Sequence, residues 1–221
     1  MVLWSGLIAA TGANNLPYTL PIHPNLVHLT LGLFIVAIGF DIVGALFPLE
    51  KRVFKFLAIP ATRSNLFDVG WYNMVAAAII TFFTVAAGFY EVLMAPPVEG
   101  VSSWGLGYQD TMIWHGLGGV LILTLIVGMT VWRGFQRYVW RQDRGRQVEW
   151  SYLLAGLVIF VLMFAQGTLG AHLGGEFGVH VTADRLLRSG VSPNQRVSST
   201  PPAEALSQPR AVGPRDFGPE E

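Results

Sequence analysis

Four long apolar runs constrain the fold of this chain more than any other feature. They cover residues 26–47, 69–94, 112–132 and 152–173. A helix needs about 20 apolar residues to cross the roughly 30 Å of hydrocarbon in a bilayer. Lipid offers the backbone no hydrogen-bond partners, so apolar runs of this length form helices. The sequence therefore predicts an all-α integral membrane protein, a bundle of four spanning helices.

The composition fits the membrane class. Of the 221 residues, 52% are hydrophobic and 13% are charged, which is too apolar for an ordinary soluble domain of this length. Cysteine is absent, which excludes disulfides, thiolate metal sites and cysteine nucleophiles. The net charge of zero gives no reason to expect a nucleic-acid partner. The expected partner is the lipid bilayer.

The predicted membrane domain, residues 26–181, lies between two more polar ends. Residues 1–25 contain a short apolar stretch and no basic residue, so we expect an outer N-terminal arm rather than a secretory signal. Residues 189–221 are rich in Pro, Ser, Gln and Glu. Such a segment cannot bury enough apolar surface to fold, which predicts a disordered polar tail.

The distribution of basic residues predicts the orientation. The loop after the first span contains four Lys or Arg residues and the loop after the third contains five, whereas residues 1–25 and 95–109 contain none. The positive-inside rule places the basic loops in the cytoplasm. Both termini then lie on the outer side, periplasmic or lumenal. We expect a multi-pass protein of the bacterial inner membrane or of a thylakoid membrane.

With this topology, each span brings one potential metal ligand to its outer end. These residues are His28, Glu91, His115 and His172. Ionisable residues in spans often mark functional sites, although a single one near the interface commonly just meets water and headgroups. On the helical period, Gly32 lies on the face of His28, and Gly118 and Gly119 lie about one turn from His115. These glycines leave room for a flat macrocycle, and close helix packing would explain them equally well.

Two aspartates in the spans also need an explanation. Asp41 lies deep in the first span, where it is either a proton-relay carboxylate or a hydrogen-bond partner of a neighbouring helix. The polar residues Asn73 and Gln166 are the candidate partners. Asp68 begins the second span and is predicted to be its N-cap.

Four short stretches of the chain resemble the motifs of a known family. The stretches "HPNLVHLTLGL", "GFYEV", "MIWHGLGG" and "GTLGAHLGGEFGVHV" resemble a family of small bacterial membrane proteins catalogued as a domain of unknown function, whose opening is His-Pro-x-x-Val-His-Phe. The resemblance covers roughly residues 20–181, with Leu29 in place of the aromatic residue. It implies that Glu91 is the family's acid, that His115 opens the third helix, and that either His172 or His180 is the closing histidine. It also implies a b-type cytochrome associated with respiratory electron transport.

The first of three hypotheses is a haem b electron-transfer protein in, or beside, a respiratory or photosynthetic chain. In an up-down bundle, spans one and three lie diagonally, about 11–14 Å apart. Histidines that face each other across that gap can ligate one iron, and His28 and His115 are the predicted pair. The haem would lie near the outer face, with Gly32, Gly118 and Gly119 beside it.

Two other hypotheses stay open. In the second, His28, Glu91, His115 and His172 hold a single Zn, Fe or Cu ion. In the third, the chain is a cofactor-free accessory subunit of a larger membrane complex. The expected protein partner is a respiratory or photosynthetic membrane complex or an outer-side redox protein. No Ser-His-Asp triad, P-loop or dinucleotide fingerprint is evident, so we expect a carrier or a subunit rather than an enzyme. We favour haem binding.

Overall fold

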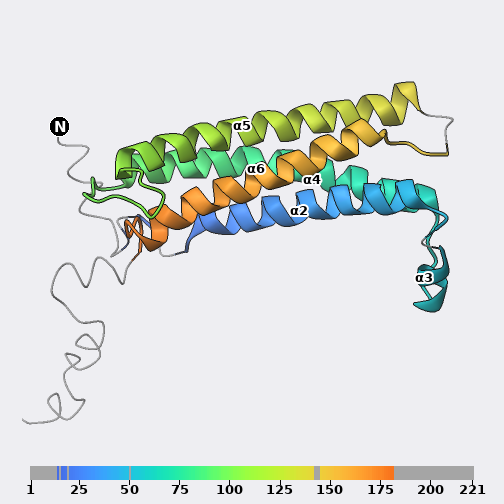
Figure 1. Ribbon diagram of the computed structural model, residues 1–221, viewed down its shortest axis with the longest axis horizontal. Helices are drawn as coiled ribbons and strands as arrows, with labels where there is room; N and C mark the ends of the chain where they lie inside the picture. The colour runs from blue at the N-terminus through green and yellow to red at the C-terminus, as the bar shows by residue number, and fades with distance from the viewer. Residues whose placement is uncertain (1–13, 15, 19, 50, 142–144, 182–221) are drawn as a thin grey trace, which may run out of the picture. The chain divides into compact units, whose positions relative to one another are not determined.

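A computed structural model describes residues 14, 16–18, 20–49, 51–141 and 145–181 (Figure 1). Its long helices are α2 (Ile22–Leu46), α4 (Arg63–Met94), α5 (Tyr108–Phe135) and α6 (Trp150–Gly175). A short helix, α3 (Lys51–Phe56), lies between the first two, and a π-helical turn, η1 (Gln136–Trp140), extends α5. Most of the predicted arm and all of the predicted tail, residues 189–221, lie outside the described residues.

The structure confirms the four predicted spans. All four long helices are long and apolar enough to cross a membrane, and the described part of the chain contains no β-strand. Each helix is longer than its apolar run. The added residues change the interpretation at the N-terminal ends of α2 and α4. Helix α2 begins at Ile22 rather than near Leu26, which brings His23 into its first turn. Helix α4 begins at Arg63 rather than near Val69.

The start of α4 corrects the predicted N-cap. The Thr62 hydroxyl accepts a hydrogen bond from the Asn65 N–H at 3.2 Å, so Thr62 caps the helix. A threonine hydroxyl accepts a hydrogen bond from a first-turn N–H as an aspartate carboxylate would, and it does so here about one and a half turns earlier. Asp68 lies inside the helix instead, where its Oδ1 is 2.6 Å from Nη2 of Arg137 on η1. The prediction for Asp68 was wrong.

The four helices form an antiparallel ring. Helix α2 packs along α4, α4 on α5, and α5 on α6, while α6 makes a smaller contact with α2 (Figure 1). Because α2 and α5 pack on the same two neighbours and not on each other, they lie diagonally, as predicted. The seam between α2 and α6 depends on a small residue: a Cβ added to Gly156 would lie 2.5 Å from Cδ1 of Ile38.

The interior is filled by side chains from all four helices, including Phe34, Phe67, Met74, Ile126 and Tyr152. Large apolar residues such as Phe82 and Phe164 are exposed on the outside of the bundle. A soluble protein would bury such side chains, whereas a bilayer solvates them. The two ends differ in charge. We call the end where α2 and α5 begin the histidine end, and the opposite end, which carries α3 and η1, the basic end.

Candidate functional site

Two histidines face each other at the histidine end, from diagonal helices. His23 lies in the first turn of α2 and His115 near the start of α5. Their ring centroids are 6.1 Å apart and the ring planes are almost perpendicular, at 89°. Both residues are half-buried. This pair places two imidazoles inside the end of the bundle, between α4 and α6.

Each ring rests on a glycine of a third or fourth helix. A Cβ added to Gly88 of α4 would lie 2.8 Å from Cε1 of His23, and one added to Gly170 of α6 would lie 2.9 Å from Cε1 of His115. Real Cβ atoms do not approach other atoms so closely, so any larger residue would displace the ring. All four helices therefore build the site: α2 and α5 supply the histidines, and α4 and α6 supply the glycines on which the rings rest.

A carbonyl oxygen fixes the orientation of the His23 ring. Its Nδ1 lies 2.9 Å from the carbonyl oxygen of Thr84, which can only accept, so Nδ1 carries a proton. In the neutral ring this leaves Nε2 unprotonated and able to bind a metal or accept a proton. The Thr84 hydroxyl bonds to that of Thr30 at 2.9 Å, which links α4 to α2 one level deeper in the bundle.

Gln166 of α6 holds the His115 ring from the other side. Its amide nitrogen lies 3.1 Å from Nδ1 of His115 and also contacts the carbonyl oxygen of the same residue. An amide N–H₂ group donates to both, so in this arrangement Nδ1 accepts and the proton of His115 is on Nε2. A bare glycine, Gly118, makes room for the Gln166 amide, since a Cβ there would overlap its oxygen.

Glu91 closes the histidine end rather than joining the two rings. Its carboxylate accepts hydrogen bonds from the Tyr18 hydroxyl at 3.0 Å and from the His23 backbone N–H at 3.2 Å. Burial and, secondly, the bond to Glu91 raise the pKa of Tyr18 to about 12, so this phenol stays a donor. The carbonyl oxygen of Glu91 bonds to Nε2 of His180 at 2.8 Å, and Nδ1 of His180 bonds to the carbonyl oxygen of Asn14 at 2.9 Å.

His172 belongs to a separate cluster. Its Nδ1 lies 2.7 Å from Oε1 of Glu176, which also accepts a hydrogen bond from the Ser103 hydroxyl at 2.7 Å. The other carboxylate oxygen, Oε2, accepts a hydrogen bond from the Ser103 N–H at 2.7 Å. These bonds from Ser103, the hydroxyl first, lower the pKa of Glu176. The ring of Trp104 packs edge-on at 5.0 Å from His172. The cluster ties the loop between α4 and α5 to the end of α6.

The structure does not bring the four predicted ligands together. His28 is exposed, and its Nδ1 bonds to the carbonyl oxygen of Pro24 at 2.7 Å. Five residues turn a helix by about 140° beyond one full turn, so His28 cannot share the direction of His23. No heavy atom lies within 4 Å of a Cβ added to Gly32, whereas Gly119 lies close to Gln166. Within the described ranges no cluster of three or more His, Asp or Glu side chains could hold a metal ion.

Sequence reasoning missed His23, Gly88 and Gly170. The predicted first span, residues 26–47, leaves His23 outside it, whereas the helix begins at Ile22. All three lie in the quoted motifs: His23 opens "HPNLVH", Gly88 opens "GFYEV", and Gly170 precedes "AHLGG". The motifs therefore contain the site residues, but the span limits taken from hydropathy leave His23 outside the first helix.

A buried ion pair lies toward the basic end of the bundle. The Arg133 guanidinium bonds to both carboxylate oxygens of Asp41, at 3.0 and 3.1 Å, and to the carbonyl oxygen of Phe67 at 3.3 Å. Both charged side chains are 0% exposed. The predicted partners of Asp41 were wrong, because Asn73 bonds to its own helix at the Val69 carbonyl and Gln166 lies at the histidine end. Arg133 was assigned to a loop, but it lies inside α5.

The comparisons with known proteins agree with this architecture. The family model described as "Predicted membrane protein (DUF2231)" matches residues 19–183, which include all four long helices. No curated protein and no solved structure matches the chain.

Proposed function

Since the chain belongs to the family described as "Predicted membrane protein (DUF2231)", a description that names no activity, we propose a function from the site itself. The protein is an integral membrane protein with four apolar helices. We propose that it binds one b-type haem between His23 and His115 and acts in electron transfer in a respiratory or photosynthetic membrane. The observation that carries this proposal is the pair of imidazoles facing each other from α2 and α5.

The spacing of the two rings suits ligation of one ion from both sides. An imidazole nitrogen binds a metal at about 2.0–2.1 Å, so two imidazoles on opposite sides of one ion have ring centres about 6 Å apart. The ring centroids of His23 and His115 are 6.1 Å apart. Perpendicular ring planes do not prevent this, because each ring needs only to direct one nitrogen at the ion.

The donor set favours a haem over a lone ion. A Zn, Fe or Cu ion held by protein alone takes three or four protein ligands. A porphyrin supplies four nitrogens and needs only one or two axial side chains. The site offers two histidines, and no third His, Asp or Glu joins them among the described residues. Two histidines match the one or two axial ligands that a haem needs, and they are too few for a lone ion.

The surrounding residues have definite tasks in this proposal. The carbonyl of Thr84 holds the Nδ1–H of His23 and leaves Nε2 free to bind, as is usual for metal-ligating histidines. Ligation through Nε2 of His115 needs the proton of that ring on Nδ1, so in the proposed bound state the Gln166 amide no longer donates to Nδ1 and keeps only its bond to the His115 carbonyl oxygen. Gly88 and Gly170 leave the space that the His23 and His115 rings occupy. The haem, when bound, supplies one-electron exchange, which fits a carrier rather than an enzyme.

An absorption spectrum of the purified full-length protein tests the proposal. We expect the reduced α-band of a low-spin, bis-histidine haem in the wild type. His23→Ala and His115→Ala should abolish the band or give a high-spin spectrum. His28→Ala is the matched control, because His28 is exposed and bonded only to its own turn, and it should keep the band. A bis-histidine spectrum in His23→Ala would overturn the assignment.

The same samples distinguish the other two functions. A non-haem site predicts no Soret band and stoichiometric metal by elemental analysis. A cofactor-free accessory subunit predicts neither haem nor metal, and tolerance of all three substitutions.

A further inference from the structure

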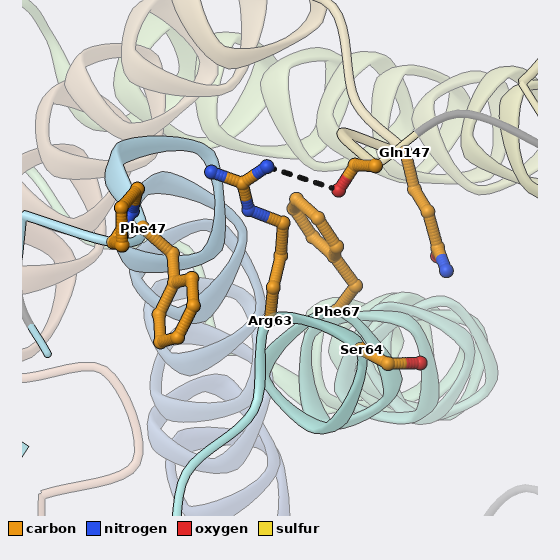
Figure 2. Close-up of a pocket in the computed structure, with 7 residues that line it drawn as sticks. Phe47, Arg63, Ser64, Phe67 and Gln147 are labelled. Carbon is orange, nitrogen blue, oxygen red and sulfur yellow. Dashed lines mark hydrogen bonds between the residues drawn. The ribbon is translucent and has the colours of Figure 1, made fainter.

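A cavity of about 500 Å³ lies at the basic end, far from the histidine pair (Figure 2). It is an open hollow bordered by three segments: the end of α2, the first turns of α4, and the chain that leads into α6. Its lining comprises Phe47, Pro48, Arg63, Ser64, Phe67, Gly145 and Gln147. The walls therefore combine aromatic rings with one guanidinium, one hydroxyl and one amide.

Arg63 is the only charged residue in this lining, and most of its N–H donors make no hydrogen bond to the described residues. Its Nη1 makes one long hydrogen bond of 3.4 Å to the carbonyl oxygen of Gly145, drawn as the dashed line in Figure 2. Its Nε is buried and has no partner among the described residues. No carboxylate of the described chain lies within 4.0 Å of the guanidinium in the way that Asp68 pairs with Arg137. A guanidinium has five N–H donors, so this one can still bind an acceptor-rich anion.

The ring of Phe47 orients the guanidinium. The Cζ atom of Arg63 lies 5.6 Å from the centre of that ring, which is the range of a cation–π contact. Figure 2 shows the guanidinium between the Phe47 and Phe67 rings. An anion bound here would therefore meet one fixed cation and, on either side, apolar surface. That combination suits an amphiphile better than a freely soluble ion.

The elements beside the hollow have the composition of a membrane–water interface. Helix α3, next to it in the chain, carries Lys51, Arg52 and Lys55 together with Phe56, which is 88% exposed. A short helix that mixes basic and exposed aromatic residues is typical of the membrane–water interface. Trp140 and Trp150 are also exposed at this end, and tryptophans gather at the same interface. Anionic lipid headgroups are therefore the nearest source of phosphate.

We propose that this cavity binds the phosphate of an anionic phospholipid, with Arg63 as its main ligand. The planar fork of arginine matches two phosphate oxygens at once. The side chains of Ser64 and Gln147 point away from the guanidinium in Figure 2, so Arg63 is the ligand and Phe47 is the apolar surface that would meet the upper part of the acyl chains. A soluble phosphate ester has the same charged group but lacks the part that these apolar walls would contact.

A lipid titration of the purified full-length protein in neutral detergent tests this. Short-chain phosphatidylglycerol should raise Tm and saturate, and native mass spectrometry should show one retained lipid. Short-chain phosphatidylcholine and inorganic phosphate should not raise Tm. Arg63→Gln should weaken phosphatidylglycerol binding about tenfold or more, since a hydrogen bond to a charged group is commonly worth that much. Arg52→Gln, which loses the same charge on α3 outside the cavity, should bind as the wild type does.

Each other outcome overturns the proposal. Equal Tm shifts from inorganic phosphate would assign the site to a soluble ligand. Equal losses in Arg52→Gln and Arg63→Gln would mean general attraction to basic residues. If Arg63→Gln yields no folded protein, Arg63→Lys keeps the charge but lacks the fork, and unchanged affinity in that variant overturns the role of Arg63. The haem spectrum reports the opposite end of the bundle, so it should not change in either variant.

Discussion

Arg133 holds Asp41 by two parallel hydrogen bonds, and the pair joins the diagonal helices α5 and α2 across the centre of the bundle. Neither side chain is exposed. Residue 70 beside them must be a glycine, because a Cβ on Gly70 would lie 2.5 Å from the Asp41 carboxylate and clash with it. The helices that carry the two histidines are therefore also held together by a charge pair near the basic end of the bundle.

Removing one member of this pair should destabilise the fold more than removing both. An unpaired buried charge commonly costs about 3–5 kcal/mol, whereas apolar replacement of both partners is often nearly neutral. We expect Asp41→Leu to lower Tm markedly and Asp41→Leu/Arg133→Met to recover much of the loss. Arg141→Gln is the control, since its contact with Glu149 is long, at 3.9 Å, and partly exposed. A double variant no more stable than the single one would contradict the expectation.

Gly88→Ala and Gly170→Ala should each displace one histidine ring. The added methyl would lie less than 3.0 Å from Cε1 of His23 or of His115. If the haem proposal holds, both variants should lose the low-spin band or bind haem much more weakly. Gly32→Ala is the matched control, because nothing lies within 4 Å of its added methyl. Haem spectra and Tm should be measured for all three, and an effect as large in Gly32→Ala would show that the ring contacts are not the cause.

Acid should loosen the loop between α4 and α5. The pKa of Glu176 is lowered, mainly by hydrogen bonds from Ser103. A carboxyl group with a lowered folded-state pKa stabilises the fold above its ordinary pKa, and this contribution is lost as pH falls through the lowered value. Hydrogen exchange of residues 101–107 should therefore rise below about pH 4.

Two substitutions control the acid experiment. Glu176→Gln should give fast exchange in this loop at all pH values, because the amide cannot replace the carboxylate toward both Ser103 and His172. Glu99→Gln changes an exposed glutamate near the same loop, and it should keep the wild-type pH profile. A pH-independent loop in the wild type would refute the role of Glu176.

Cysteine labelling tests the orientation that the basic loops predict. The chain contains no cysteine, so single substitutions report cleanly. Val101→Cys lies at the histidine end on a 70% exposed residue, and Phe56→Cys lies on α3 at the basic end. A membrane-impermeant maleimide should label Val101→Cys from the outer side and Phe56→Cys only after the membrane is opened. Labelling of both from the outside would invalidate the topology.

The sequence predicted the spans well because hydropathy acts on whole helices. Backbone hydrogen bonds and the bilayer thickness together fix four helices and their antiparallel order, whichever side chains pack inside. The helix ends were less predictable. Thr62 caps α4 well before its apolar run begins, and α2 begins four residues before Leu26. That difference decides which histidine, His23 or His28, faces His115.

Pairing across the interior was not predictable from these patterns. Arg133 follows Trp132 at the end of an apolar run, where a basic residue normally meets cytoplasmic water. Its burial depends on Asp41, which is 92 residues away in the chain. The Glu91 contacts depend likewise on Tyr18 and His180, which approach from opposite ends of the domain. Such partners are set by helix rotation, and rotation follows from packing that a single sequence does not display.

The small contact between α2 and α6 has a consequence for biosynthesis. These are the first and last spans to leave the ribosome, so the ring of helices stays open on one side until α6 has inserted. During that interval His23 and His115 already stand on α2 and α5, next to lipid. Gly170 and Gln166 arrive only with α6, so the surroundings of the second histidine are complete only after the fourth span has inserted.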